Sequence, residues 1–226
     1  MTPALVIFDC DGVLVDSEAI ASWVLAQTLT EAGFNISPAE CVDRFTGLSL
    51  DSVAQAVHKR WRRPLPEDFL DRLRARDRAA FAARLTAIDG AADAVMALPC
   101  PVCVASSGSM EKITHSLTLT GLIDLFTPHL FSASLVAAGK PAPDLFLYAA
   151  AQFRVDPADC VVVEDSLNGV KAGVAAGMTV LGFHGGAHFA GRAPDVLRQA
   201  GARLVFKEMA DLPRLIETLD PEALIP

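Results

Sequence analysis

Short apolar runs alternate with helix-like patterns along most of this chain. Near-continuous apolar runs are typical of strands buried on both faces, and alternation with helices favours a mostly parallel sheet with helices on both faces. The predicted strands are Ala4–Phe8, Val102–Ala105, Leu130–Ser132, Cys160–Glu164, Thr179–Phe183 and Leu204–Phe206. The predicted helices between them are Ala91–Leu98, Met110–Thr120, Asp144–Phe153, Leu167–Ala176, Ala193–Ala200 and Met209–Leu219.

One segment interrupts this alternation. From about residue 17 to residue 85 the sequence offers amphipathic helical patterns and no convincing buried strand. These patterns are Glu18–Ala32, Pro38–Phe45, Leu50–Trp61 and Glu67–Arg84. The chain therefore predicts an α/β fold with a Rossmann-like core at 1–16 and 86–226, and an inserted α-helical domain at 17–85.

Composition narrows the classes of function. The chain has 226 residues, of which 52% are hydrophobic, enough for a substantial core and too many for a disordered protein. Its net charge of -8 argues against a nucleic-acid-binding surface. No apolar stretch approaches the roughly 18–20 residues of a membrane span, and the first residues lack the basic region of a secretory signal. We expect a cytoplasmic monomer without nucleic-acid or membrane partners.

The five cysteines are scattered and odd in number, which suits reduced thiols. Cys100 and Cys103 have the C-x-x-C spacing of redox pairs. Residues 101–105, however, read as a strand, whereas redox pairs usually open a helix. Two buried thiols are therefore the favoured interpretation.

Side chains that bind ions follow four of the predicted strands, at the edge where open parallel sheets bind ligands. Carboxylates gathered there repel one another unless a cation lies among them, and hard oxygen ligands suit Mg²⁺. Plainer interpretations exist for each: helix caps for the serines and the second acid pair, and a surface position for the lysine. In strand order the residues are Asp9 and Asp11; Ser106, Ser107, Gly108 and Ser109; Lys140; Glu164 and Asp165.

These strand ends carry a resemblance to a known family. The segment DCDGVLVDS, residues 9–17, resembles the first motif of the haloacid dehalogenase superfamily. Ser106, Lys140 within GKPAPD, and Glu164-Asp165 within EDSLNGVKAG resemble its second, third and fourth motifs in order and spacing. The helical insert resembles that superfamily's small helical cap. The resemblance covers essentially the whole chain and is nearest to phosphatases and phosphomutases of phosphorylated sugars and other small metabolites.

The resemblance implies chemistry for the first motif. Asp9 would be the nucleophile that forms an acyl-phosphate. Asp11 would donate a proton to the leaving alkoxide and then activate water as a base. We expect Mg²⁺ to favour the ionised form of Asp9, and repulsion between the carboxylates to favour the neutral form of Asp11.

The other motifs imply the binding groups. The predicted Mg²⁺ ligands are Asp9, the backbone carbonyl of Asp11, Asp165, and Glu164 either directly or through water. The predicted phosphate-binding residues, which would also offset charge in the transition state, are Ser106, Ser107, Gly108 and Lys140.

Dehalogenases of this superfamily lack the second aspartate, so Asp11 favours phosphoryl transfer.

Two alternatives to a phosphatase stay open, a phosphomutase and a protein without catalytic activity. Related glucose-phosphate mutases carry a cap arginine after a glycine equivalent to Gly47, a histidine where this chain has Ala21, and a lysine near Ser109. None of these is present, so we expect hydrolysis of a sugar or sugar-acid phosphate rather than β-phosphoglucomutase-like transfer. A catalytically idle relative that binds a phosphorylated ligand is the non-enzyme alternative.

Several residues have no firm role. The cap is expected to select the leaving group, with candidate residues Glu18, Phe45, Thr46 and Ser49. The basic run at 59–63 is better explained as a solvated helix end than as an anion patch. His184, after a predicted strand, is better explained as a loop histidine than as a catalytic one.

Overall fold

Six parallel strands form one sheet in the computed structural model, which describes residues 2–46, 48–189 and 193–219. Their order in the sheet is β3-β2-β1-β4-β5-β6, and every neighbouring pair is parallel. The predicted fold class is therefore confirmed. The strands are β1 (Leu5–Phe8), β2 (Val102–Ser106), β3 (Leu130–Ser132), β4 (Cys160–Glu164), β5 (Thr179–Phe183) and β6 (Leu204–Phe206).

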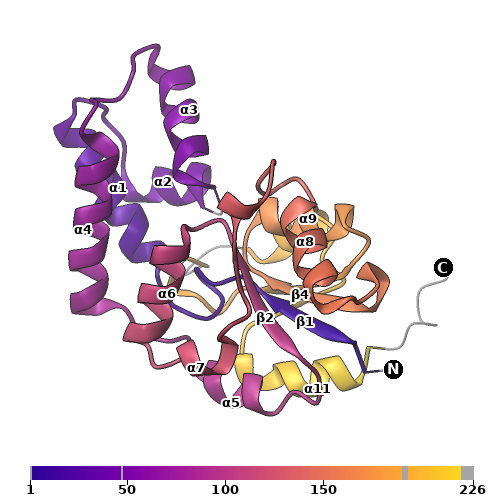
Figure 1. The fold of residues 1–226 in the computed structure, drawn as a ribbon. Helices are drawn as coiled ribbons and strands as arrows, with labels where there is room; N and C mark the ends of the chain where they lie inside the picture. Colours follow the sequence, from indigo (N-terminus) through magenta and orange to yellow (C-terminus); the bar gives the residue numbers. More distant parts are fainter. Residues whose placement is uncertain (1, 47, 190–192, 220–226) are drawn as a thin grey trace.

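Alternate residues of β1 point to opposite faces of the sheet and enter different hydrophobic clusters. Val6 and Phe8 pack with the first set of helices, and Leu5 and Ile7 with the second. Figure 1 shows α8 and α9 on the opposite side of β1 from α5 and α11. The first set is α5 (Ala91–Met96), α6 (Met110–Leu119), α7 (Ile123–Phe126) and α11 (Leu212–Glu217). The second set is α8 (Asp144–Phe153), α9 (Leu167–Ala175) and α10 (Asp195–Gln199).

The inserted segment is helical and has a hydrophobic cluster of its own, which includes Phe34, Val57 and Phe69. Its helices stand together beside the sheet rather than on its two covered faces (Figure 1). We call this segment the cap, and its boundaries at 17 and 85 stay a prediction. The cap helices are α1 (Glu18–Glu31), α2 (Pro38–Phe45), α3 (Leu50–Trp61) and α4 (Phe69–Arg84).

The structure differs from the predicted elements mainly near prolines. The helix predicted at 209–219 is a 3₁₀ turn, Met209–Asp211, followed by α11, whose first turn contains Pro213. The helix predicted from Ala193 begins only after Pro194. Proline fits the first turn of a helix but cannot donate within it, so both helices are shorter than their apolar patterns. The four-residue α7 was not predicted.

The cysteines are free thiols. Cys103 lies buried in β2, and burial raises its pKa. Cys100 is only half-buried, so the expectation of two buried thiols is wrong for that residue. Within the described residues, no helix is long and apolar enough to cross a membrane.

Candidate active site

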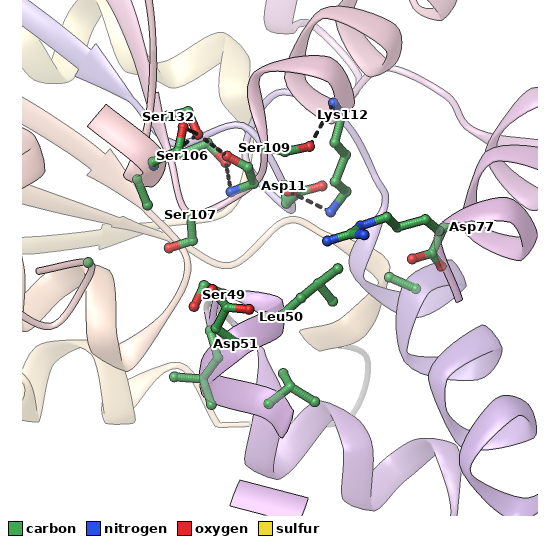
Figure 2. A pocket seen from close by; sticks show the side chains of 18 of the residues that line it. Asp11, Ser49, Leu50, Asp51, Asp77, Ser106, Ser107, Ser109, Lys112 and Ser132 are labelled. Carbon is green, nitrogen blue, oxygen red and sulfur yellow. Dashed lines mark hydrogen bonds and ion pairs between the residues drawn. The ribbon is translucent and has the colours of Figure 1, made fainter. Parts of the chain in front are cut away.

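A pocket of about 680 Å³ lies between the carboxyl edge of the sheet and the cap. Figure 2 shows Asp11, Ser106 and Ser107 on the core side of this pocket, with Ser49 and Leu50 of the cap across from them. The structure thus brings residues from separate strand ends to one place. The core residues at the strand ends that line it include Asp9, Asp11, Ser106, Ser107, Gly108, Ser132 and Gly139. Lys140, Glu164 and Asp165 are not among the residues that line it.

Lys140 links two of the predicted motifs. Its buried amine donates to Oδ1 of Asp9 and to Oε1 of Glu164, each at 2.6 Å. The other oxygen of Glu164 accepts hydrogen bonds from the backbone N–H (2.9 Å) and the hydroxyl (3.0 Å) of Ser166. Ser166 itself caps α9 by accepting from the Gly169 N–H. A surface position for Lys140 and a helix-capping role for Glu164 are both wrong.

Asp11 is held by two donors, one of which the sequence analysis missed. Ser17 donates to Oδ1 at 2.6 Å, and the amine of Lys112 donates to Oδ2 at 2.8 Å. Lys112 lies in the first turn of α6, where Ser109 caps the helix by accepting from the Lys112 N–H. Helical side chains point back toward the helix N-terminus, here the strand edge. The position of Lys112 in the first turn of this helix could therefore have predicted that its side chain reaches the strand ends.

The two aspartates of the first motif have opposite pKa shifts. Burial raises the pKa of Asp9 well above its ordinary value, against the opposing attraction of Lys140. Burial would also raise the pKa of Asp11, but the ion pair with Lys112 and the hydrogen bond from Ser17 outweigh it and lower that pKa. The expectation that repulsion favours the neutral form of Asp11 is therefore wrong. Two donors hold Asp11 in its ionised form.

Asp165 lies next to the first-motif loop. Gly12 adopts a positive φ of 81°, and a Cβ there would collide with Oδ2 of Asp165, so only glycine lets the two approach. Oδ2 is buried, and Nε2 of His188 lies 3.1 Å from it without hydrogen-bond geometry. His188 was not predicted. His184, the histidine considered from the sequence, donates its backbone N–H to the carbonyl of Phe206 and is not in this contact.

The carboxylate oxygens decide whether these residues fit a metal ion. Oδ2 of Asp165 is a buried carboxylate oxygen that accepts no hydrogen bond from the described residues, which fits a cation. Burial, followed by repulsion from Glu164, raises the pKa of Asp165, as expected for acids gathered without a cation. As the side chains stand, no three described His, Cys, Asp or Glu residues are arranged to hold a metal ion. The carboxylate oxygens are compatible with Mg²⁺, although those of Glu164 already accept hydrogen bonds from Lys140 and Ser166.

The loop after β2, residues 106–109, is held in shape by hydrogen bonds, and we call it the serine loop. Ser106 accepts from the Gly108 N–H at 3.1 Å, and Ser132 donates to the Gly108 carbonyl at 2.7 Å. The helix-cap interpretation holds for Ser109 alone. The loop beside Asp9 is therefore preorganised at the edge of the pocket.

Three of the four predicted cap residues line the pocket, together with others that were not predicted. Glu18, Phe45 and Ser49 line the pocket, as does Ala21, whereas Thr46 is not among the residues that line it. Gly47 lies outside the described residues. The sequence analysis did not identify the cap cations in the pocket, which are Arg74 and Arg78 of α4.

The basic run at 59–63 serves the cap itself. Arg60 forms a 3.0 Å ion pair with Glu40, and Arg63 donates to the backbone carbonyl of Ala32 at 2.8 Å. These contacts agree with the plainer interpretation of the run. Arg78 instead forms an ion pair with Glu111 of α6, so it joins the cap to the core at the pocket.

Comparisons with known proteins agree with this geometry. The profile of the haloacid dehalogenase-like hydrolase family matches residues 3–177. The 6-phosphogluconate phosphatase of Escherichia coli strain K12 is 35% identical over 179 residues, which cover 79% of this chain and 81% of that protein.

Two solved structures are similar over nearly the whole chain. A conserved haloacid dehalogenase-like protein of unknown function from Agrobacterium tumefaciens is 41% identical, with a TM-score of 0.81, over 96% of this chain and 98% of that one. A HAD family hydrolase from Deinococcus radiodurans, solved with bound phosphate and sodium, is 37% identical, with a TM-score of 0.74, over 96% of both chains. The profile match and these identities show that the chain belongs to the haloacid dehalogenase-like hydrolase family.

Proposed function

We propose that this protein is a Mg²⁺-dependent phosphatase that hydrolyses a small sugar or sugar-acid phosphate through an aspartyl-phosphate on Asp9. The observation that carries the proposal is the meeting of Asp9, Asp11 and the serine loop in one pocket covered by a cap. The named phosphatase among its relatives supports a phosphoric monoester hydrolase that acts on small phosphorylated metabolites.

In the proposed reaction, Asp9 attacks phosphorus and Asp11 serves the leaving group. The carboxylate of Asp9 forms a bond to phosphorus while the ester oxygen leaves with a proton from Asp11. Asp11 then takes a proton from water, which hydrolyses the acyl-phosphate. Because Lys112 and Ser17 favour ionised Asp11, the acid step requires that substrate binding draws the Lys112 amine away, toward the negative phosphoryl group, and that Asp11 takes up a proton from solvent.

The remaining groups bind charge. Asp9, the Asp11 carbonyl and Asp165 would hold Mg²⁺, with Glu164 through water because its oxygens already accept from Lys140 and Ser166. Bound Mg²⁺ would neutralise phosphoryl oxygens and favour ionised Asp9. The serine loop and Lys140 would hold the phosphoryl group in the transition state.

We propose hydrolysis rather than mutase transfer, although the cap places more cations in the pocket than the sequence predicted. Arg74 and Arg78 line the pocket, but each is paired with a carboxylate, Asp71 and Glu111 respectively. Both arginines are therefore partly neutralised, which weakens their hold on a second phosphate. We also propose that the protein is a monomer and that it is located in the cytoplasm.

The test is phosphate release from p-nitrophenyl phosphate and from a panel of sugar and sugar-acid phosphates, each with Mg²⁺ and with EDTA. We expect Mg²⁺-dependent release from all of them, fastest for a member of the panel. No release from any ester would favour the idle phospho-ligand-binding relative, and equal release with EDTA would remove the metal from the proposal. Incubation with β-glucose 1-phosphate and catalytic glucose 1,6-bisphosphate tests the mutase: glucose 6-phosphate forming faster than phosphate would overturn hydrolysis.

A further inference from the structure

The pocket extends away from the strand ends into the space beside α4 and α6, where two buried polar atoms have no partner. Oδ1 of Asp77 and Nε2 of His115 accept or donate no hydrogen bond among the described residues, and both residues line the pocket. A buried polar atom without a hydrogen bond destabilises the fold, and native structures contain few of them. Two such atoms inside one pocket indicate contacts that a ligand completes.

The position of Asp77 on α4 strengthens this interpretation. Leu73 and Phe81 lie four residues before and after it, so the three share one face of the helix. Both neighbours are almost completely buried, with exposed fractions of 1% and 2%. Between these two core side chains, Oδ1 of Asp77 accepts no hydrogen bond from the described residues and can accept one from a ligand. Burial also raises the pKa of Asp77 to about 6, a sign that its charge is poorly solvated.

We propose that Asp77 and His115 bind hydroxyl groups on the alcohol part of the substrate, so that the enzyme selects polyhydroxylated phosphate esters. A hydroxyl donates to a carboxylate and can either donate to or accept from an imidazole nitrogen, so a diol satisfies both atoms. The inference rests on the proposed function and deepens it by naming the residues that recognise the hydroxyl groups of the substrate.

The surrounding charges favour a hydroxyl over an ammonium group as the donor to Asp77. The positive charge of Lys112 interacts with Asp77, and Figure 2 shows the two on the same side of the pocket. Arg74 and Arg78 line the same wall. Each of these three cations is paired with a carboxylate, namely Asp11, Asp71 or Glu111. A neutral hydroxyl donates to Asp77 without adding a further positive charge beside them. Leu73 and Phe81 offer apolar contact to the carbon chain of a polyol.

The test compares two six-carbon esters, hexitol 6-phosphate and n-hexyl phosphate, which differ in their hydroxyl groups. The measured quantity is the ratio of kcat/KM for the hexitol ester to that for the hexyl ester. We expect Asp77→Leu to lower this ratio about tenfold to a hundredfold, and Asp77→Asn, which keeps an acceptor oxygen, to lower it less. His115→Leu should lower it in the same direction. Any effect of the Asp77 charge on Lys112 and Asp11 acts on both esters and cancels in the ratio.

The matched control is Asp68→Asn, an exposed aspartate that precedes the same helix, which should keep the wild-type ratio. An unchanged ratio in Asp77→Leu, including an equal loss on both esters, would overturn the role of Asp77. A wild-type enzyme that hydrolyses p-nitrophenyl phosphate but does not prefer the hexitol ester would overturn the inference and leave the phosphatase intact. A wild-type protein that hydrolyses no ester would overturn both.

Discussion

The two halves of the pocket differ in how their polar side chains are satisfied. At the strand ends, Asp9 and Glu164 share the amine of Lys140, and Asp11 accepts from both Ser17 and Lys112. Oδ2 of Asp165, which accepts no hydrogen bond from the described residues, is left to the proposed Mg²⁺. Beside α4 and α6, Oδ1 of Asp77 and Nε2 of His115 lack partners. The first half is held in place before substrate arrives, as chemistry on a phosphoryl group requires. The second leaves hydrogen bonds to the substrate, as selection among alcohols requires. Reaction and recognition are thus divided between the halves.

The largest expected effect is in the strand-end half. Asp9→Asn should lower turnover by several powers of ten, on the order of 10⁴-fold, because the amide cannot form the acyl-phosphate. The ratio of kcat/KM for the hexitol ester to that for the hexyl ester is not informative here, because the activities on both esters should be lost together. Asp195→Asn, an exposed aspartate on α10, should retain wild-type turnover. Retained activity in Asp9→Asn with an unchanged circular dichroism spectrum would remove Asp9 from the role of nucleophile.

The metal-binding part of the same half gives the next effect. Asp165→Ala should weaken Mg²⁺ binding about a hundredfold by calorimetry, because it removes a charged ligand. The metal-free variant should melt at or slightly above the wild-type temperature, since burial and Glu164 raise the pKa of Asp165 and its ionised form is unfavourable there. Asp195→Ala is the control for both readouts. Unaltered Mg²⁺ affinity would show that Asp165 is not a ligand.

Lys112 lies where the two halves meet, so its replacement tests how separate they are. Lys112→Met removes the 2.8 Å ion pair with Asp11 and the cation that faces Asp77. We expect kcat/KM to fall about tenfold to a hundredfold on every ester. Lys207→Met, at an exposed lysine, is the control. A loss confined to polyhydroxylated esters would instead place Lys112 in the recognition half.

The smallest expected effect is on stability and belongs to the recognition half. Because burial raises the pKa of Asp77 to about 6, the folded protein binds a proton there more readily than the unfolded chain. That contribution is fully present below about pH 4 and is lost as the pH rises through about 6. Asp77→Asn cannot ionise, so its melting temperature should gain about 3–6 °C on the wild type between pH 4 and pH 7. A difference in melting temperature that does not change with pH would show that the pKa of Asp77 is not raised in the folded protein.

The same division explains what could be predicted from the sequence. The strands are continuous apolar runs, so their ends located Asp9, Lys140 and Glu164 in the chain, and the topology brought them together. Lys112 of α6 contacts Asp11 within the core, and its charge interacts with Asp77 across the boundary between core and cap. Helical periodicity places each on a face of its own helix but does not say which other helix that face meets.

His188 was missed for a related reason. It lies in a short 3₁₀ turn, Ala187–Phe189, which has no periodic pattern, and it reaches Asp165 only because Gly12 lets that carboxylate approach. The direction of the pKa shift of Asp11 was predicted wrongly because Lys112 was not known to contact Asp11. Contacts between elements distant in the chain decide both points, and one sequence does not specify them.

The central claim, that the strand-end half forms a covalent intermediate on Asp9, is tested most directly by trapping. The enzyme is mixed with Mg²⁺ and a phosphate ester that it turns over, quenched in acid during the steady state, and digested for peptide mass spectrometry. The account predicts the mass of one phosphoryl group on the peptide that carries Asp9, and none on that peptide from Asp9→Asn. A phosphoryl group on Ser106 or Ser107, or an Asp9→Asn variant that turns over as fast as the wild type, would contradict it.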